Sequence, residues 1–215
     1  MRPDKKMVVL VSSTVYGIEE LLDRIYTLLT AFGYEVWMSH KGTMPVFSDR
    51  SAFDNCIKAV ERCDLFLGLI TPYYGSGVAE GKVSITHQEL IKAIEFKKPR
   101  WLLAHDHVVF ARKLFDDLGY KGKAGRSRLN NLKAKASSIS DLRVIDAYEE
   151  AVRQREPLRD RKGNWVQKFQ SDEDAFLFAM AQFSRYQEVE AFIRENLSDP
   201  SKIGSLIKPK GARDE

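Results

Sequence analysis

Short, nearly continuous apolar segments recur along the first hundred residues and constrain the fold more than any other feature. Met7–Ser13 and Asp64–Ile70 are the clearest examples, and Arg100–Ala104 is a third. A strand that is apolar along its whole length is typical of a parallel sheet covered by helices on both faces. Segments with the helical spacing of apolar residues separate these strands, the first running from Ile18 to Phe32. The sequence therefore predicts an α/β fold.

The alternation of strand and helix continues through Ala104. We predict that Gly33 caps the first helix at its C-terminus and that Tyr34–Met38 is the second strand. Ser48 or Asp49 can cap the next helix, which then extends to Glu61. Crossover connections of this kind are right-handed, and binding sites in such sheets lie at the C-terminal ends of the strands.

Residues after Ala104 complete the predicted fold. Leu142–Ile145 reads as a fifth strand and Tyr148–Arg155 as the helix that follows it. Ser171–Asp174 forms a capping box that opens a long helix ending before Pro200. Phe176, Ala179, Met180, Phe183, Val189 and Ile193 are the residues that we expect this helix to bury.

These elements define the predicted domain organisation. An α/β domain of about five strands occupies residues 1–155, with its core at 7–104 and a basic connector at 119–140. A helical extension packs on it over residues 156–200, and a flexible polar tail covers residues 201–215.

Composition and cysteine spacing place the chain among ordinary soluble proteins. Of its 215 residues, 44% are hydrophobic and 30% are charged, and no apolar run reaches the ~18 residues that span a bilayer. The N-terminal residues lack the apolar stretch of a signal peptide. Cys56 and Cys63 lie two turns apart on one predicted helix, about 10 Å from each other, too far for a disulfide. We expect reduced, buried thiols in a cytoplasmic protein with no membrane partner.

The positive charge is concentrated between Gly119 and Ser140. This segment holds six Lys or Arg residues and no acidic one. Such a run attracts phosphate-bearing partners, or it is simply a solvated loop. Only Tyr120 supplies an aromatic ring, whereas a nucleic-acid groove uses several. We do not expect nucleic acid as a partner.

Glu89 is the candidate catalytic residue. It lies on the predicted helix from Ser84 to Phe96, where Leu90, Ala93 and their neighbours form the core face. Glu89 falls on the border of that face, among apolar residues, rather than on the solvent stripe. A carboxylate in such surroundings is expected to be partly desolvated, and desolvated carboxylates cluster at functional sites. The alternative is an edge glutamate that reaches water.

Four segments together resemble the Toll/interleukin-1 receptor (TIR) family, specifically its bacterial TIR-like group with a Val-Ser-Ser-Thr start, long described as a domain of unknown function. Val9–Ser13 resembles the family's first strand and Gly33–Trp37 its second. Ile57–Leu69 resembles the second helix and third strand. Tyr73-Tyr74, followed by His87–Leu90, resembles the tyrosine loop and the Glu-Leu helix. The resemblance covers residues 7–104 and implies a flavodoxin-like parallel sheet.

The resemblance implies an NAD-consuming enzyme of the NAD glycohydrolase or ADP-ribosyl cyclase type. In catalytic TIR domains, the glutamate that matches Glu89 cleaves the bond between nicotinamide and ribose, so NAD is a substrate and no cofactor is required. The family's usual Trp-Cys pair is Ile85-Thr86 here. The resemblance also implies a homo-oligomer or assembly with another protein, and a role in defence against phage.

Other residues are candidates for holding such a nucleotide. Ser12, Ser13 and Thr14 offer hydroxyls and backbone amides for phosphate, or else they cap the first helix. Trp37 offers a ring for stacking, or else it is an ordinary aromatic residue of the strand. Tyr73 and Tyr74 offer an aromatic wall, and His87 is a proton carrier or a satisfied core residue. Asp49 and Arg50 are candidates for contacts with ribose or phosphate. His105–His107 has the residue types of a metal site, but three consecutive residues are not expected to face one ion, so we predict no metal.

Two alternative functions stay open at this point. One is a non-catalytic TIR-like interaction module, because many TIR domains are adaptors. The other is an N-glycosidase similar to the nucleoside deoxyribosyltransferases, which use a glutamate nucleophile on a related sheet.

Overall fold

The computed structural model describes residues 6–75, 77, 83–129 and 138–185, and its centre is a five-stranded parallel sheet. The order of the strands is β2-β1-β3-β4-β5, and every neighbouring pair is parallel. The strands are β1 (Val8–Ser13), β2 (Glu35–Trp37), β3 (Leu65–Ile70), β4 (Arg100–His105) and β5 (Val166–Phe169). The predicted fold class is confirmed.

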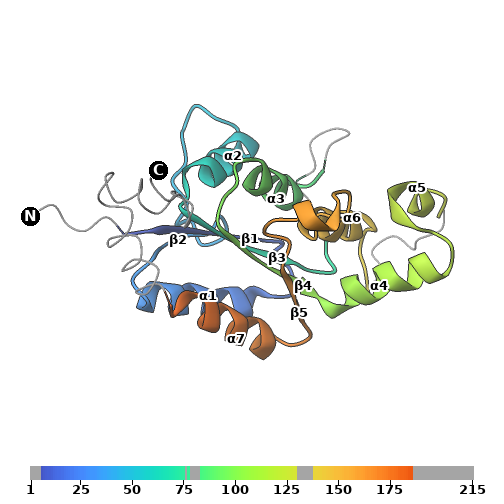
Figure 1. The fold of residues 1–215 in the computed structure, drawn as a ribbon. Helices are drawn as coiled ribbons and strands as arrows, with labels where there is room; N and C mark the ends of the chain where they lie inside the picture. Colours follow the sequence, from blue (N-terminus) through green and yellow to red (C-terminus); the bar gives the residue numbers. More distant parts are fainter. Residues whose placement is uncertain (1–5, 76, 78–82, 130–137, 186–215) are drawn as a thin grey trace, which may run out of the picture.

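Helices cover both faces of this sheet (Figure 1). On one face lie α1 (Glu19–Ala31) and α7 (Asp172–Phe183), and on the other lie α2 (Ala52–Arg62), α3 (Ile85–Glu95) and α6 (Arg143–Ala151). Beyond the end of β4 lie α4 (Asp106–Asp117) and the short α5 (Gly122–Arg126), and a 3-10 turn spans Leu158–Asp160. Two covered faces explain why β3 and the first four residues of β1 carry no polar side chain.

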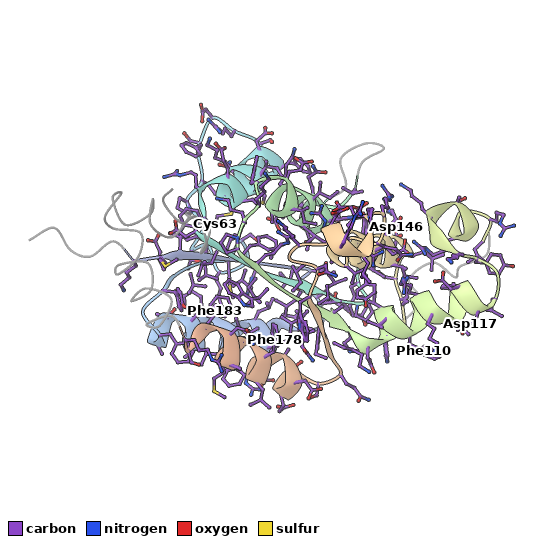
Figure 2. The ribbon with its side chains drawn as sticks, viewed as in Figure 1. Cys63, Phe110, Asp117, Asp146, Phe178 and Phe183 are labelled. Carbon is purple, nitrogen blue, oxygen red and sulfur yellow. The ribbon has the colours of Figure 1, made fainter. Side chains whose placement is uncertain are left out.

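Each face has its own apolar core. Leu21, Leu22, Ile25 and Leu29 recur at helical spacing on α1 and are at most 2% exposed. Phe183 of α7 joins the same core, whereas Phe110 of α4 lies at the surface (Figure 2). Burying a side chain of this size stabilises the fold by roughly 1.5–3 kcal/mol.

Helix ends largely follow the predicted chemistry. Gly33 has a φ of +94°, directly after the last residues of α1, as its predicted capping role requires. Ser171 and Asp174 form the predicted capping box of α7. The prediction for α2 was wrong, since its cap is Ser51, whose hydroxyl accepts from the backbone N–H of Asp54 at 3.0 Å.

The predicted fifth strand at Leu142–Ile145 was wrong, because Leu142 is the N-cap of α6 and Arg143–Ile145 form its first turn. Val144, Ala147 and Ala151 are buried at helical spacing, so the helical period overrides the short apolar run. The fifth strand is instead β5, in which Val166 pairs with Leu102 and Phe169 with His105. The segment predicted as a helical extension therefore contributes a strand to the sheet as well as α7.

Two smaller expectations also changed. Met180 is 37% exposed rather than buried, whereas Ala179 and Phe183 are buried as predicted. Val189 and Ile193 lie outside the described residues. Both cysteines are free and buried, as predicted. No helix among the described residues has the length and apolar character that crossing a bilayer requires.

The basic connector is partly internal. Its Arg126 is only 4% exposed and pairs with Asp146 at 2.5 Å and with Glu149 at 2.7 Å, both on α6. This arginine attaches α5 to α6 and is not a free charge for a phosphate. Lys133 and Lys135 lie outside the described residues.

Candidate active site

Glu89 is buried where α3 crosses the C-terminal end of β1. Only 6% of the residue is exposed, and its carboxylate accepts a hydrogen bond of 2.5 Å from the Oγ of Ser12, the fifth residue of β1. Ser84 caps α3 by accepting from the backbone N–H of His87 at 3.3 Å, which fixes the start of the helix. The first strand and the third helix thus present one hydroxyl and one carboxyl to each other.

Burial raises the pKa of the Glu89 carboxyl to about 7, although hydrogen bonds from Ser12 and Cys56 act in the opposite direction. Cys56, on α2, is the second partner, and burial together with the adjacent carboxylate raises the pKa of its thiol to about 12. The thiol is therefore protonated at neutral pH and donates to the carboxylate. A carboxyl with a pKa near 7 can hold or release a proton under physiological conditions.

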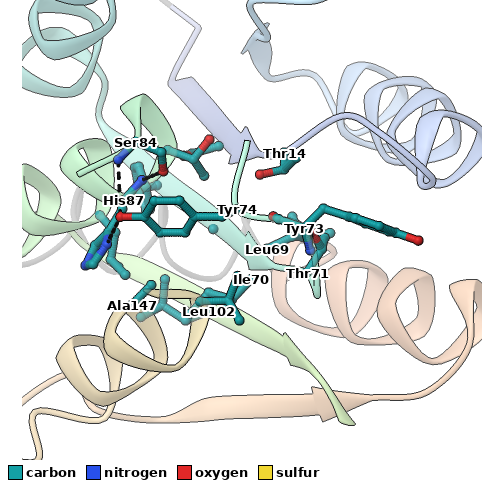
Figure 3. A pocket seen from close by; sticks show the side chains of 16 residues that line it. Thr14, Leu69, Ile70, Thr71, Tyr73, Tyr74, Ser84, His87, Leu102 and Ala147 are labelled. Atoms are coloured by element: carbon teal, nitrogen blue, oxygen red, sulfur yellow. Dashed lines mark hydrogen bonds between the residues drawn. The ribbon is translucent and has the colours of Figure 1, made fainter. Parts of the chain in front are cut away.

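A narrow pocket lies beside this pair. Its free volume is about 30 Å³, the space of about one water molecule. The end of β1, the end of β3 with its loop, α3 and α6 form its walls (Figure 3). Among the described residues that line it are Ser12, Thr14, Tyr73, Tyr74, His87 and Ala147. Glu89 is not among the residues that line the pocket, but its hydrogen-bond partner Ser12 is.

Tyr74 and His87 form a hydrogen-bonded pair within the pocket wall. The Tyr74 hydroxyl accepts from the backbone N–H of Ser84 at 3.2 Å and lies 2.8 Å from Nδ1 of His87 (Figure 3). Burial lowers the pKa of His87 to about 4, so the ring is neutral at pH 7. The tyrosine hydroxyl already accepts from Ser84, so we assign it as the donor to Nδ1, and this assignment places the ring proton on Nε2. That nitrogen is buried and has no hydrogen-bond partner among the described residues.

Of the other two hydroxyl residues at the end of β1, Ser13 bonds to the backbone and Thr14 lines the pocket. Ser13 donates its hydroxyl to the carbonyls of Thr14 and Leu69, which occupies it within the backbone. Thr14 faces the pocket, and neither serine caps α1, because that helix begins after Ile18 with no side-chain cap. Tyr73 packs edge-to-face on Tyr16 with ring centroids 5.0 Å apart and points away from Tyr74 (Figure 3).

Three predicted binding residues lie outside this pocket. Trp37 is 5% exposed in the core at the end of β2, and its Nε1 donates to Glu35 at 2.8 Å. Asp49 and Arg50 are exposed on the loop before α2, where the Arg50 guanidinium lies 4.6 Å from the centre of the Phe47 ring. The pocket wall contains none of the three.

Cys56 is the site residue whose role the sequence did not reveal. Its position on α2 marked it as a buried thiol, but the packing of α2 against α3 brings it to the carboxylate. Val144 and Ala147 of α6 were also missed as pocket residues, because a strand was predicted at Leu142–Ile145, where the helix begins. No local sequence signal identifies such contacts between helices distant in the chain.

No curated protein matches the chain. A family model described as "Domain of unknown function (DUF4062)" matches residues 8–198, which include all five strands and α7. The match covers most of the chain, and the family description assigns no activity. The chain therefore belongs to the DUF4062 family.

Proposed function

We propose that this protein is an N-glycosidase that cleaves the nicotinamide–ribose bond of NAD, with Glu89 as its catalytic carboxylate. The observation that supports this most is the buried Ser12–Glu89 pair, joined by a 2.5 Å hydrogen bond at the C-terminal edge of a parallel sheet. Ligands in sheets of this class bind at that edge. The resemblance of residues 7–104 to TIR domains supplies NAD as the substrate.

The chemistry suits a single buried carboxylate. Nicotinamide leaves as a neutral molecule from a cationic pyridinium, so the leaving group needs little acid catalysis. Positive charge develops on the ribose, and a carboxylate held in a medium of low polarity stabilises it more strongly than one in water. A cationic substrate also lowers the pKa of Glu89 from about 7, which favours the ionised form that the reaction needs.

Substrate entry requires side chains to move. The free space beside Ser12 holds about one water molecule, and Glu89 does not line it. In the proposed complex a ribose hydroxyl replaces the Ser12 hydroxyl as the donor to Glu89. The unpartnered Nε2–H of His87 is a donor for a polar atom of the same ligand.

The small pocket also favours a second candidate, a non-catalytic assembly module. Phe110 on α4 is 66% exposed, and Leu118, the C-cap of the same helix, is 61% exposed, which is apolar surface that a partner could cover. Three results together would support this function: the wild type self-associates, the Phe110→Asp variant does not, and neither turns over a nucleotide.

The test is incubation of the purified protein with NAD, at both dilute and high protein concentration, with release of nicotinamide measured by chromatography. We expect release by the wild type and its loss in Glu89→Gln. The matched control is Glu95→Gln, which removes an exposed carboxylate on the same helix and should leave activity unchanged. Release of free base from deoxynucleosides with NAD untouched would identify a deoxyribosyltransferase-like enzyme instead. Equal activity in Glu89→Gln would remove the proposed role.

A further inference from the structure

Three potential metal ligands converge where β4 ends and α4 begins. His105 is the last residue of β4 and the N-cap of α4, and Asp106 and His107 are the first two residues of the helix. One ring nitrogen of each histidine and one carboxylate oxygen all lie within 4.8 Å of one another. Three consecutive residues were not expected to face one ion, but the turn from strand into helix brings one potential ligand atom of each residue close together.

The polar groups in this cluster are incompletely satisfied. Nδ1 of His105 accepts a hydrogen bond of 3.2 Å from the backbone N–H of His107, so Nε2 is the nitrogen that this ring can offer to an ion. Oδ1 of Asp106 lies 3.2 Å from the same Nδ1, is buried, and has no hydrogen-bond donor among the described residues. Two acceptor atoms at this distance repel each other unless a positive charge lies near both.

We infer that His105, Asp106 and His107 bind a divalent transition-metal ion of the zinc type. Two imidazoles and one carboxylate are the ligands of three-residue zinc sites, which leave a fourth position for water. A cation would satisfy the Asp106 oxygen and remove the repulsion. His107 is exposed, so an ion can reach the cluster from solvent.

The surrounding charges favour a cation. Asp172, at the start of α7, is close enough to His105 for the two groups to influence each other electrostatically, whereas the neighbouring Glu173 is paired with Arg24 at 3.1 Å. The N-terminus of α4 carries a partial positive charge that opposes a cation, but the full negative charges of Asp106 and Asp172 outweigh it.

This site is separate from Glu89. His105 packs edge-to-face on Phe169, with ring centroids 5.2 Å apart, and Phe169 belongs to the core under α1 and α7. Glu89 lies on α3, which packs on the other face of the sheet. Metal binding therefore does not depend on the proposed glycosidase activity.

Calorimetric titration of untagged, chelator-treated protein with Zn²⁺ tests the inference. The chain has only four histidines, so few other imidazoles compete for the ion. We expect one ion per chain, and an affinity at least about tenfold weaker in His107→Ala and Asp106→Asn. His40→Ala removes a histidine elsewhere and should bind as the wild type does. Co²⁺ absorption of the wild type should show a site of low coordination number that His107→Ala lacks. Absence of binding by the wild type, or unchanged affinity in both cluster variants, would overturn the inference; thermal unfolding without metal verifies that these variants fold.

Discussion

Replacing Glu89 with glutamine should change how protein stability depends on pH. In the folded protein the pKa of this carboxyl is raised to about 7 from an ordinary value of 4.5. The folded state therefore retains a proton between these two values that the unfolded chain has lost. Stability falls as pH rises wherever the folded state binds more protons, so the wild type loses stability across this window.

The magnitude follows from the shift. At about 1.4 kcal/mol per pH unit, a pKa shift from 4.5 to about 7 lowers the unfolding free energy of the wild type by roughly 3 kcal/mol. This loss of stability is complete above pH 7 and absent below pH 4.5. Glutamine does not titrate and resembles the protonated acid in shape. Its carbonyl oxygen can still accept from the Ser12 hydroxyl.

Urea unfolding of both proteins at several pH values from 4.5 to 8 measures the difference. We expect the unfolding free energy of Glu89→Gln, relative to the wild type, to increase by about 3 kcal/mol from the lowest to the highest pH. Glu95→Gln, an exposed change on the same helix, should differ from the wild type by less than about 0.5 kcal/mol throughout. A difference between Glu89→Gln and wild type that does not vary with pH would refute the burial argument.

Three further changes test other parts of the account. The pKa of His87 is lowered to about 4, so between pH 6.5 and pH 4 the unfolded chain binds a proton that the folded protein does not, and the wild type loses stability as pH falls. His87→Gln should remove this loss when unfolding by urea is measured at several pH values. An acid dependence equal to that of the wild type would contradict the argument. Arg126→Met removes the buried cation that pairs with Asp146 and Glu149, and it should lower the unfolding free energy by about 3–5 kcal/mol. An unfolding free energy equal to that of the wild type would show that the pairs are dispensable. Gly125→Ala places a Cβ 2.5 Å from a backbone carbon of Tyr120 and should cost about 1–3 kcal/mol, seen as a lower melting temperature; no change would mean that α5 shifts freely.

The features that the sequence predicted are those carried by local pattern. The apolar runs of β1, β3 and β4 require a doubly covered sheet, and the spacing of apolar residues places α1 on it. The strand β5 was missed because it is short and lies at the edge of the sheet, where Lys168 is exposed and the apolar signal is weak.

The candidate site shows the same division. The border position of Glu89 on its helix predicted a desolvated carboxylate, and the structure buries it more completely than expected. Its partners Ser12 and Cys56 lie far away in the sequence, and only tertiary packing brings them to the carboxylate. Trp37 lies in the core at the end of β2, which is one of the two roles that an aromatic residue at a strand end can have.

A structure of the protein with NAD or ADP-ribose bound would test the proposed role of Glu89 most directly. The proposal predicts that the ribose lies at the C-terminal edge of the sheet, within hydrogen-bond distance of the Glu89 carboxylate, with the Ser12 hydroxyl no longer bonded to it. A nucleotide bound elsewhere while the Ser12–Glu89 bond stays intact would contradict it.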